Sequence, residues 1–225
     1  ADYHLDLAAM EKAVDSNTKL VYICNPNNPT GTALDTSKLK DFCERVSKKT
    51  LVFVDEAYID YLGNVKEVTM LDCVHKEQNV IVARTLSKLY GFAGLRMGYI
   101  MAKPDLIKKI EPYSTTFFTI SAPAIHAAIA GINDDVYLKS AFDKTEKSKQ
   151  YLYSKLKEEG YSYIPSKTNF VMFPLQMEGK RFVDEMMKRG VGLRQWKLNG
   201  KDWCRISIGR MDEMEAFAAA FKELS

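Results

Sequence analysis

The sequence predicts an α/β fold over residues 1–133, with parallel strands joined by crossover helices, followed by a small α+β domain. Short, continuous apolar runs such as 51–54 and 80–83 are typical of strands buried in a parallel sheet. They alternate with amphipathic stretches that fit crossover helices. After residue 134 this alternation stops, and a long charged helix leads into short strands. We therefore expect a second domain over 134–225 that includes this connecting helix.

Apolar spacing and capping residues indicate the elements of the first domain. Asp6 can accept hydrogen bonds from the first amides of a helix, and Leu7, Met10 and Val14 follow at helical spacing. The other elements expected here are a strand at 19–24, a helix begun by Asp35 or Thr36 with Leu39, Phe42, Cys43 and Val46 buried, strands at 51–54, 80–83 and 97–102, a helix at 105–111 after Pro104, and a helix at 122–132. Residues 113–120 are aromatic and threonine-rich, and fit either a loop that lines a pocket or an interface.

The second domain begins with a helix at 134–159, which Gly160 ends because glycine favours the position after a helix. The elements expected after it are strands at 161–164 and 169–172, a helix at 181–189 with Phe182, Val183, Met186 and Met187 facing inward, strands at 191–194 and 203–208 around a turn at Gly200, and a closing helix at 212–224 with Met214, Phe217, Ala218 and Phe221 on its apolar face.

Composition and charge exclude several classes of protein. The chain has 225 residues, of which 46% are hydrophobic, so it can bury a sizeable core. Its net charge of +3 lies on a surface of mixed sign and gives no case for nucleic acid or acidic membranes. No apolar run approaches the ~20 residues that a membrane helix needs. The cysteines and histidines lack metal-ligand spacing, so we expect reduced thiols and no metal site. The chain opens at Ala1 without Met, which leaves any upstream segment and its targeting signal open.

One stretch after an apolar strand, residues 85–98, carries groups for cofactor chemistry. Thr85, Ser87 and Arg96 offer two hydroxyl donors and a guanidinium fork, which together could hold a phosphate. Lys88 follows the strand end, where an α/β sheet usually carries its site. A lysine beside a phosphate site suits Schiff-base chemistry with an aldehyde cofactor. The alternative for Lys88 alone is a solvated side chain in a connecting loop.

Two further loops follow strand ends. In residues 25–31, Asn-Pro-Asn-Asn-Pro-Thr-Gly, two prolines hold the backbone extended, so an asparagine amide such as that of Asn28 can be aimed with little loss of entropy. Asp55 ends a buried apolar strand, which is costly unless it meets a cation or hydrogen-bond donors. It could keep a heterocyclic nitrogen protonated, and the hydroxyl of Tyr58 would need a partner nearby. A plain connector for the first loop and a helix N-cap for Asp55 are the alternatives.

These motifs, in this order, resemble the class I/II pyridoxal-phosphate aminotransferases of fold type I. The resemblance rests on Asn-Pro-Asn-Asn-Pro-Thr-Gly at 25–31, Val-Asp-Glu-Ala-Tyr at 54–58, Thr-Leu-Ser-Lys at 85–88 and Gly-Leu-Arg-x-Gly at 94–98. The run Asp-Glu-Ala-Tyr-Ile-Asp-Tyr looks most like the histidinol-phosphate aminotransferase branch. The resemblance implies that 1–133 is the C-terminal part of the cofactor-binding large domain, a mostly parallel sheet with helices on both faces.

The resemblance also implies a role for each residue. Lys88 would bind pyridoxal 5'-phosphate as a Schiff base and shuttle the proton on the substrate Cα, and Asp55 would pair with the ring nitrogen. Tyr58 and Asn28 would hydrogen-bond the phenolic oxygen of the cofactor. The phosphate would be held by Thr85, Ser87 and Arg96.

In the second domain, three residues match substrate-binding positions of this family. Arg205, in Cys-Arg-Ile-Ser-Ile-Gly, would bind the α-carboxylate, with Cys204 where the family has Leu. Asn169 falls near that carboxylate, and Arg194 falls where histidinol-phosphate enzymes bind the distal phosphate. An internal salt bridge is the alternative for Arg205, because a buried arginine must be paired. The surrounding Leu-Arg-Gln-Trp and Gly-Arg depart from the family pattern and leave the substrate open.

The function implied is transfer of an amino group between histidinol phosphate or an L-amino acid and 2-oxoglutarate, by a cytoplasmic homodimer in amino-acid biosynthesis such as that of histidine. A decarboxylase of the same fold, of the threonine-phosphate type, shares nearly all these motifs and is the alternative. The family carries a Gly-rich turn and an aromatic that stacks on the cofactor before the point where this chain starts. A catalytically incomplete fragment that binds a partner or cofactor weakly is therefore a third interpretation.

Overall fold

The computed structural model describes residues 3–114 and 120–224, and the contacts among them form two units. The large unit comprises Ala1–Asn28 and Ala33–Leu138, and the small unit comprises Pro29–Thr32 and Lys139–Ser225. Most of the threonine-rich segment 113–120 lies outside the described residues. Among the residues that are described, no helix combines the length and the apolarity that crossing a membrane requires.

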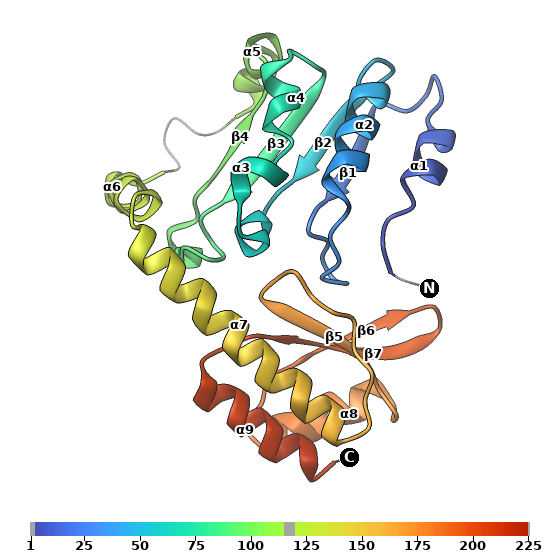
Figure 1. The fold of residues 1–225 in the computed structure, drawn as a ribbon, viewed down its shortest axis with the longest axis vertical. Helices are drawn as coiled ribbons and strands as arrows, with labels where there is room; N and C mark the ends of the chain where they lie inside the picture. The colour runs from blue at the N-terminus through green and yellow to red at the C-terminus, as the bar shows by residue number, and fades with distance from the viewer. Residues whose placement is uncertain (1–2, 115–119, 225) are drawn as a thin grey trace. The chain divides into compact units, whose positions relative to one another are not determined.

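A four-stranded sheet forms the centre of the large unit, in the order β1-β2-β3-β4 (Figure 1). Its strands are β1 (Leu20–Cys24), β2 (Leu51–Asp55), β3 (Val80–Thr85) and β4 (Gly98–Met101). The first three are parallel, and β4 pairs antiparallel with β3 at the edge. The register places Cys24 opposite Asp55 and Asp55 opposite Ala83, so the carboxyl ends of three strands meet at one edge. The predicted α/β class, with a mostly parallel sheet, is confirmed.

Helices precede, connect and follow these strands, and three of those described begin after a side chain that caps them, Asp6, Asp35 or Ser121. The helices of the large unit are α1 (Leu7–Ala13), α2 (Thr36–Val46), η1 (Ile59–Leu62), α3 (Val65–Val68), α4 (Leu71–His75), η2 (Ala93–Leu95), α5 (Pro104–Ile110), η3 (Glu111–Tyr113) and α6 (Ala122–Ile132). The Asp6 carboxylate accepts a hydrogen bond from the Ala9 amide, as predicted. Asp35, rather than Thr36, caps α2 by accepting one from the Lys38 amide at 2.9 Å.

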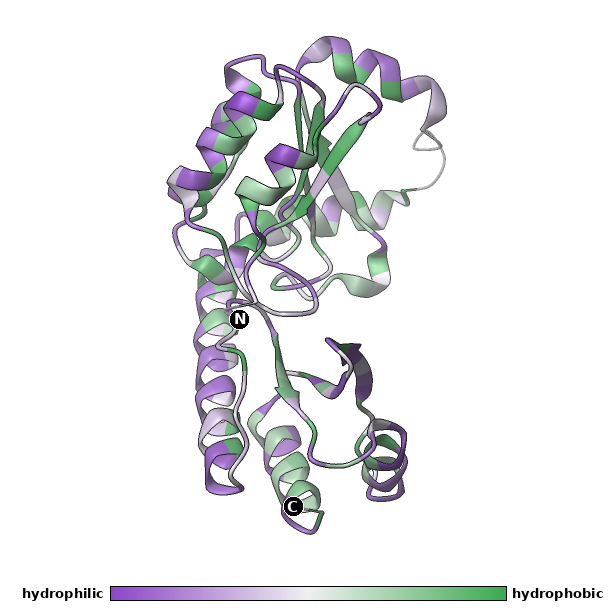
Figure 2. Ribbon diagram, turned by 90° about the vertical axis from the view of Figure 1, so that its right-hand side faces the viewer, coloured by the Kyte–Doolittle hydropathy of each residue, from purple (hydrophilic) through white to green (hydrophobic). Residues whose placement is uncertain are grey.

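The core of the large unit lies between one face of the sheet and the helices α2 and α4 (Figure 1). Strand side chains alternate between faces, so every second residue of β1 and β2 enters this core. The buried strand and helix residues here include Val21, Ile23, Val52, Val54, Leu39, Phe42, Cys43 and Val46. Figure 2 shows the strands of this sheet as largely hydrophobic and the surrounding helices as mixed. On the opposite face of β1, Leu20 and Tyr22 are 45% and 52% exposed.

A three-stranded antiparallel sheet, in the order β5-β7-β6, forms the centre of the small unit. The elements here are α7 (Asp135–Glu158), whose first residues belong to the large unit, β5 (Phe170–Pro174), α8 (Gly179–Lys188), β6 (Arg194–Leu198), β7 (Lys201–Ser207) and α9 (Met211–Lys222). Aromatic rings fill its core, where Phe173 meets Phe182 and Phe221 edge to face. The separate segment Pro29–Thr32 joins this unit through Gly31, whose carbonyl accepts a hydrogen bond from the Lys167 amide at 2.7 Å.

The strand predicted at 161–164 is wrong. Within the described part of the chain, this stretch contributes one isolated bridge, from Ile164 to Met172. Pro165 follows directly and has no backbone N–H, so the ladder cannot continue through it.

Two further local predictions need correction. The strand expected at 191–194 begins at Arg194, because Gly190 holds a left-handed φ of 79° and delays the extended run. On α8, Met187 is 58% exposed, whereas Phe182 and Met186 are buried at i and i+4. The buried stripe of this short helix is therefore narrower than the run of apolar residues suggested.

Candidate active site

A cavity of about 360 Å³ opens where the parallel strands of the large unit end. Strand β1 ends at Cys24 and β2 at Asp55, and the loop after β3 carries Lys88. Parallel strands that end at one edge bring their loops together there. The cavity is lined by Leu5, Tyr22, Cys24, Asn27, Asn28, Asp55, Ala57, Tyr58 and Lys88. Of the residues predicted from the sequence, the structure thus brings Lys88, Asp55, Tyr58 and Asn28 together.

Buried neighbours anchor the loop that carries Lys88. Leu86 and Leu89 are 2% and 7% exposed, and the Lys88 carbonyl accepts a hydrogen bond from the Gly91 amide at 3.0 Å. The Lys88 Nζ lies 5.2 Å from the centroid of the Tyr58 ring, within range of a cation–π contact. Across residues 3–114 and 120–224, no carboxylate forms an ion pair with this amine. The amine is therefore held at the cavity without a neutralising acid from the described chain.

Asp55 is held by a donor on each of its carboxylate oxygens. The Ala57 amide donates to Oδ1 at 3.0 Å, and the Tyr22 hydroxyl donates to Oδ2 at 2.6 Å. The contact with Ala57 closes a turn, and the next helix begins only at Ile59, so the alternative of Asp55 as a helix N-cap is wrong. Burial, followed by the hydrogen bond to Asp55, raises the pKa of the Tyr22 phenol above its ordinary value. Tyr22 was not among the predicted site residues.

The register of β1 and β2 is the signal that would have identified Tyr22. Tyr22 pairs with Phe53, and side chains two residues apart on a strand share a face. Tyr22 therefore lies on the same face as Asp55, one strand away. The apolar runs alone do not specify that register.

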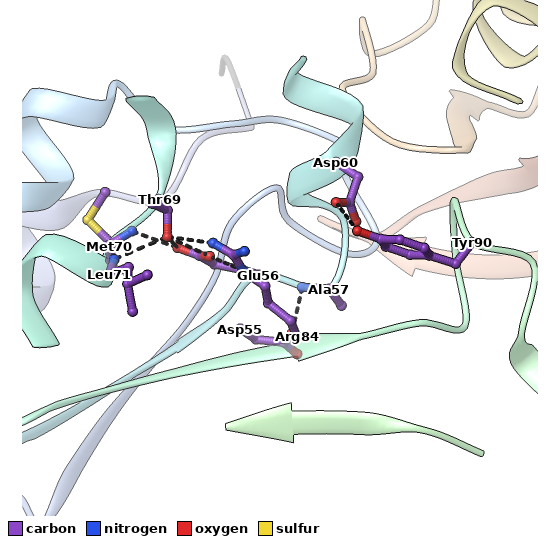
Figure 3. Close-up of polar contacts among 9 residues, drawn as sticks. All are labelled: Asp55, Glu56, Ala57, Asp60, Thr69, Met70, Leu71, Arg84 and Tyr90. Atoms are coloured by element: carbon purple, nitrogen blue, oxygen red, sulfur yellow. Dashed lines mark hydrogen bonds and ion pairs between the residues drawn. The ribbon is translucent and has the colours of Figure 1, made fainter. Parts of the chain in front are cut away.

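Next to Asp55 in the sequence, the buried carboxylate of Glu56 lies in a network of polar contacts (Figure 3). Its Oε2 is 2.9 Å from the Nε of Arg84, its Oε1 accepts a hydrogen bond from the Met70 amide at 2.7 Å, and the Thr69 hydroxyl donates to the carboxylate at 3.0 Å. An Arg84 Nη2 also donates to the Thr69 hydroxyl oxygen at 2.8 Å. Burial raises the pKa of Glu56, against the Met70 amide and the Arg84 charge, which act in the opposite sense.

This network connects the segments that carry Asp55 and Lys88. Glu56 directly follows Asp55, and Arg84 directly precedes Thr85 at the end of β3. Sequence reasoning missed the pair, although a strand-end acid next to a strand-end arginine on a neighbouring run is a readable signal. A second contact joins the following turns, because the Tyr90 hydroxyl donates to Asp60 Oδ1 at 3.5 Å (Figure 3).

Of the three residues predicted to bind a phosphate, only two lie in contact with each other. The Thr85 hydroxyl donates to Ser87 Oγ at 2.9 Å or to the Met97 carbonyl at 3.1 Å, and the Ser87 amide donates back to Thr85 Oγ1. Arg96 is exposed, has a left-handed φ of 55°, and donates to the Ala93 carbonyl at 3.0 Å. The two hydroxyls therefore lie together, whereas the Arg96 guanidinium is engaged with its own turn.

In the small unit, the two predicted substrate arginines are neighbours. Arg194 of β6 and Arg205 of β7 face each other across the antiparallel ladder. Both line a cavity of about 550 Å³, together with Ser207 and Glu213. The Arg205 guanidinium lies 4.7 Å from the centroid of the Phe170 ring, and Arg205 is half-buried rather than fully buried.

The third predicted substrate residue, Asn169, lies apart from this cavity lining. Its carbonyl accepts a hydrogen bond from the Ile208 amide at 2.8 Å, which extends the pairing of β5 and β7 by one residue. The described residues contain no group of three or more His, Cys, Asp or Glu side chains arranged to hold a metal ion.

The family model for aminotransferase class I and II matches residues 1–221. Histidinol-phosphate aminotransferase 2 of Carboxydothermus hydrogenoformans is 38% identical over 210 residues, which cover 92% of this chain and 58% of that protein. Histidinol-phosphate aminotransferase 1 of Bacillus cereus is 38% identical over 220 residues, which cover 97% and 59%. The chain spans about three fifths of the length of these curated relatives.

A solved structure shows the same arrangement of elements. The histidinol-phosphate aminotransferase of Sinorhizobium meliloti, crystallised in complex with pyridoxal-5'-phosphate, superposes with a TM-score of 0.84. Its sequence is 30% identical, and the match covers 97% of this chain and 61% of that one.

Proposed function

This chain belongs to the class I and II aminotransferases, and from that premise we propose that it binds pyridoxal phosphate and transfers an amino group from an amino donor to a 2-oxo acid. One observation carries the proposal. The amine of Lys88 and the carboxylate of Asp55 line one cavity at the carboxyl ends of parallel strands. An amine suits an aldehyde, and a carboxylate suits a protonated ring nitrogen.

The residues around this cavity fit pyridoxal phosphate. Lys88 is paired with no carboxylate of the described chain, so its amine is available to an aldehyde. Asn28 and Tyr58 line the same cavity and would hold the phenolic oxygen of the cofactor. Thr85 and Ser87 lie together, three residues and one residue before Lys88, where their hydroxyls can donate to a phosphate.

When bound, pyridoxal phosphate supplies an aldehyde that takes the amino group and an electron-withdrawing ring that stabilises negative charge. Lys88 would hold the cofactor in the resting enzyme and then carry the proton at the substrate Cα. Asp55 would keep the proton on the ring nitrogen, which preserves the ring as an electron sink. Tyr58 and Asn28 would orient the ring, and Tyr58 also lies beneath the amine of Lys88.

We also propose that the amino donor carries a phosphate, as histidinol phosphate does. Two arginines opposite each other in a ladder repel, and an anion between them removes that cost. Guanidinium groups match carboxylate and phosphate oxygens with two parallel hydrogen bonds. Arg205 would take the α-carboxylate of the 2-oxo acid, and Arg194 would assist when the ligand is a phosphate. The names of the relatives support this choice of donor.

Borohydride reduction of the protein with bound cofactor tests the role of Lys88. Trypsin cannot cut after a modified lysine, so the label should appear on the peptide 85–96, between Arg84 and Arg96, with Lys88 uncut. Lys88→Arg keeps the charge but cannot form the bond, and it should carry no label. A label on another lysine while Lys88 is cleaved normally would contradict the assignment.

Asp55→Asn tests the partner of the ring nitrogen. The variant should still be labelled at Lys88, but amino transfer should fall by about a hundredfold or more because the ring loses its charge partner. Near-normal turnover would mean that Asp55 only stabilises its local turn, through the hydrogen bond from the Ala57 amide. Measuring the 2-oxo acid consumed, alongside carbon dioxide released, separates amino transfer from the decarboxylase alternative.

Single-turnover kinetics with histidinol phosphate, an aromatic amino acid and glutamate test the choice of donor. Arg194→Ala should slow the reaction of the phosphorylated donor alone. Arg205→Lys should slow all three, because an ammonium cannot copy the two-point fork. Equal slowing of all three donors by Arg194→Ala would favour a general or aromatic aminotransferase.

A further inference from the structure

Tyr22 reaches Asp55 from the neighbouring strand. Tyr22 of β1 pairs with Phe53 of β2, and Asp55 lies two residues further along the same face. Two residues of a strand span roughly 6.6 Å, which a tyrosine lying along the sheet can cover. The Tyr22 ring stacks on Phe53 with 5.7 Å between centroids and 20° between planes. This stacking limits the directions in which the Tyr22 hydroxyl can point.

The two donors to Asp55 together determine the plane of its carboxylate. A carboxylate held at one oxygen can still rotate about the bond between Cβ and Cγ. Asp55 is held at Oδ1 by the Ala57 amide and at Oδ2 by Tyr22, so this rotation is blocked. An ionised carboxylate has about four lone-pair sites, so Oδ2 can accept another donor while Tyr22 remains bound.

We propose that Tyr22 is a positioning residue, whose hydroxyl orients the Asp55 carboxylate for the ring nitrogen of bound pyridoxal phosphate. The inference rests on the proposed function. Tyr22 acts through Asp55 and carries no proton in the transfer itself. Its phenol remains a donor at neutral pH because burial and the neighbouring carboxylate oppose its ionisation. The carboxylate is therefore oriented before the cofactor binds, so cofactor binding carries no entropy cost for ordering it.

Tyr22→Phe isolates the hydroxyl, because it keeps the ring stacked on Phe53. Tyr22 is 52% exposed, so removing its hydroxyl should not affect folding. Tyr113→Phe is the matched control, since it removes the same hydroxyl from a side chain that is 90% exposed. Cofactor-free protein is titrated with pyridoxal phosphate, and the absorbance gives the dissociation constant. In Tyr22→Phe this constant should rise about threefold to tenfold, and in Tyr113→Phe it should not change.

A second readout reports the ring nitrogen directly. With pyridoxal phosphate labelled with ¹⁵N in the ring, NMR follows the pH at which that nitrogen loses its proton. This pH should fall in Tyr22→Phe, towards the value for Asp55→Asn. If Tyr22 acts through Asp55, adding Tyr22→Phe to Asp55→Asn should produce no further change in either measurement.

The sign of the change decides between orientation and competition. Tighter binding or a raised ring-nitrogen pKa in Tyr22→Phe would show that the phenol competes for Oδ2, and would overturn the proposal. Unchanged values, or an additive effect on top of Asp55→Asn, would overturn it as well. Absence of the borohydride label at Lys88 in the unmodified protein would instead refute the proposed function itself. A normal label with an unchanged Tyr22→Phe refutes the role of Tyr22 alone.

Discussion

Removing the Glu56 carboxylate tests whether the buried network supports the site. Glu56→Ala deletes the ion pair to Arg84 at 2.9 Å and the acceptor of the Met70 amide. It leaves Arg84, whose side chain is 18% exposed, without its counter-charge. Breaking a buried pair from one side typically costs about 3–5 kcal/mol. Because a domain is stable by only about 5–15 kcal/mol, the variant should lose a large fraction of its free energy of unfolding.

Urea unfolding followed by circular dichroism gives this free energy, and hydrogen exchange gives its location. The Met70 amide, which donates to Glu56, should lose its protection first. Glu56→Gln retains an acceptor oxygen for Met70 and should lose less than Glu56→Ala. The difference between the two variants separates the hydrogen bond from the charge pair.

A surface pair of the same chemistry provides the control. Glu11 and Arg45 form an ion pair at 2.8 Å, with side chains 24% and 54% exposed. Solvent screens such a pair, so Glu11→Ala should hardly change the unfolding curve. Equal losses in Glu11→Ala and Glu56→Ala would refute the reasoning from burial. So would unchanged protection of the Met70 amide in Glu56→Ala.

Three further predictions concern strain, pH and thiol reactivity. Gly31→Ala should lower the stability of the small unit by about 2–4 kcal/mol, because φ is +76° and a Cβ would lie 2.4 Å from the side chain of Ser166. Gly200→Ala, at a φ of +74° with nothing within 4 Å of the added Cβ, should show the backbone cost alone in the same thermal unfolding experiment. Burial raises the pKa of Asp60, so the folded state loses stability as the pH rises through the folded-state pKa and this carboxyl ionises. Asp60→Asn should therefore increase the free energy of unfolding at pH 8 but not at a pH below the ordinary pKa of 3.8. An equal gain at both pH values would contradict this. Burial also raises the pKa of the Cys204 thiol, so mass spectrometry should find it alkylated only after unfolding, later than the half-exposed Cys24.

The sequence predicted which loops carry the site because it shows where strands end. Asp55 and Lys88 each follow a continuous apolar run, and parallel strands end at a common edge, so their meeting in one cavity follows from the pattern. Tyr22 was not predictable in this way. Its contact with Asp55 depends on the register of β1 and β2, and strands that are apolar on both faces leave a register unspecified.

Single backbone features explain the other local differences. Pro165 stops a strand that the tyrosines at 161 and 163 suggest, and Gly190 delays the strand that begins at Arg194. Arg96 was grouped with Thr85 and Ser87 as a guanidinium for a phosphate; in this structure it donates to the Ala93 carbonyl, and its role stays a prediction. The individual residue roles, the domain boundary after 133, the homodimer and the cytoplasmic location stay predictions.

The short segment Pro29–Thr32 has a consequence for how this protein can be divided. The chain passes from one unit to the other three times, after Asn28, Thr32 and Leu138. A clone that starts at Lys139 would lack Gly31, and the Lys167 amide would lose its acceptor. A single protease cut in α7 would likewise yield two pieces, and the segment Pro29–Thr32 of the small unit would remain on the amino-terminal piece. The small unit is therefore encoded by two separate stretches of the gene. A minimal version of it needs Pro29–Thr32 as well, either added as a separate peptide or joined to the rest by circular permutation.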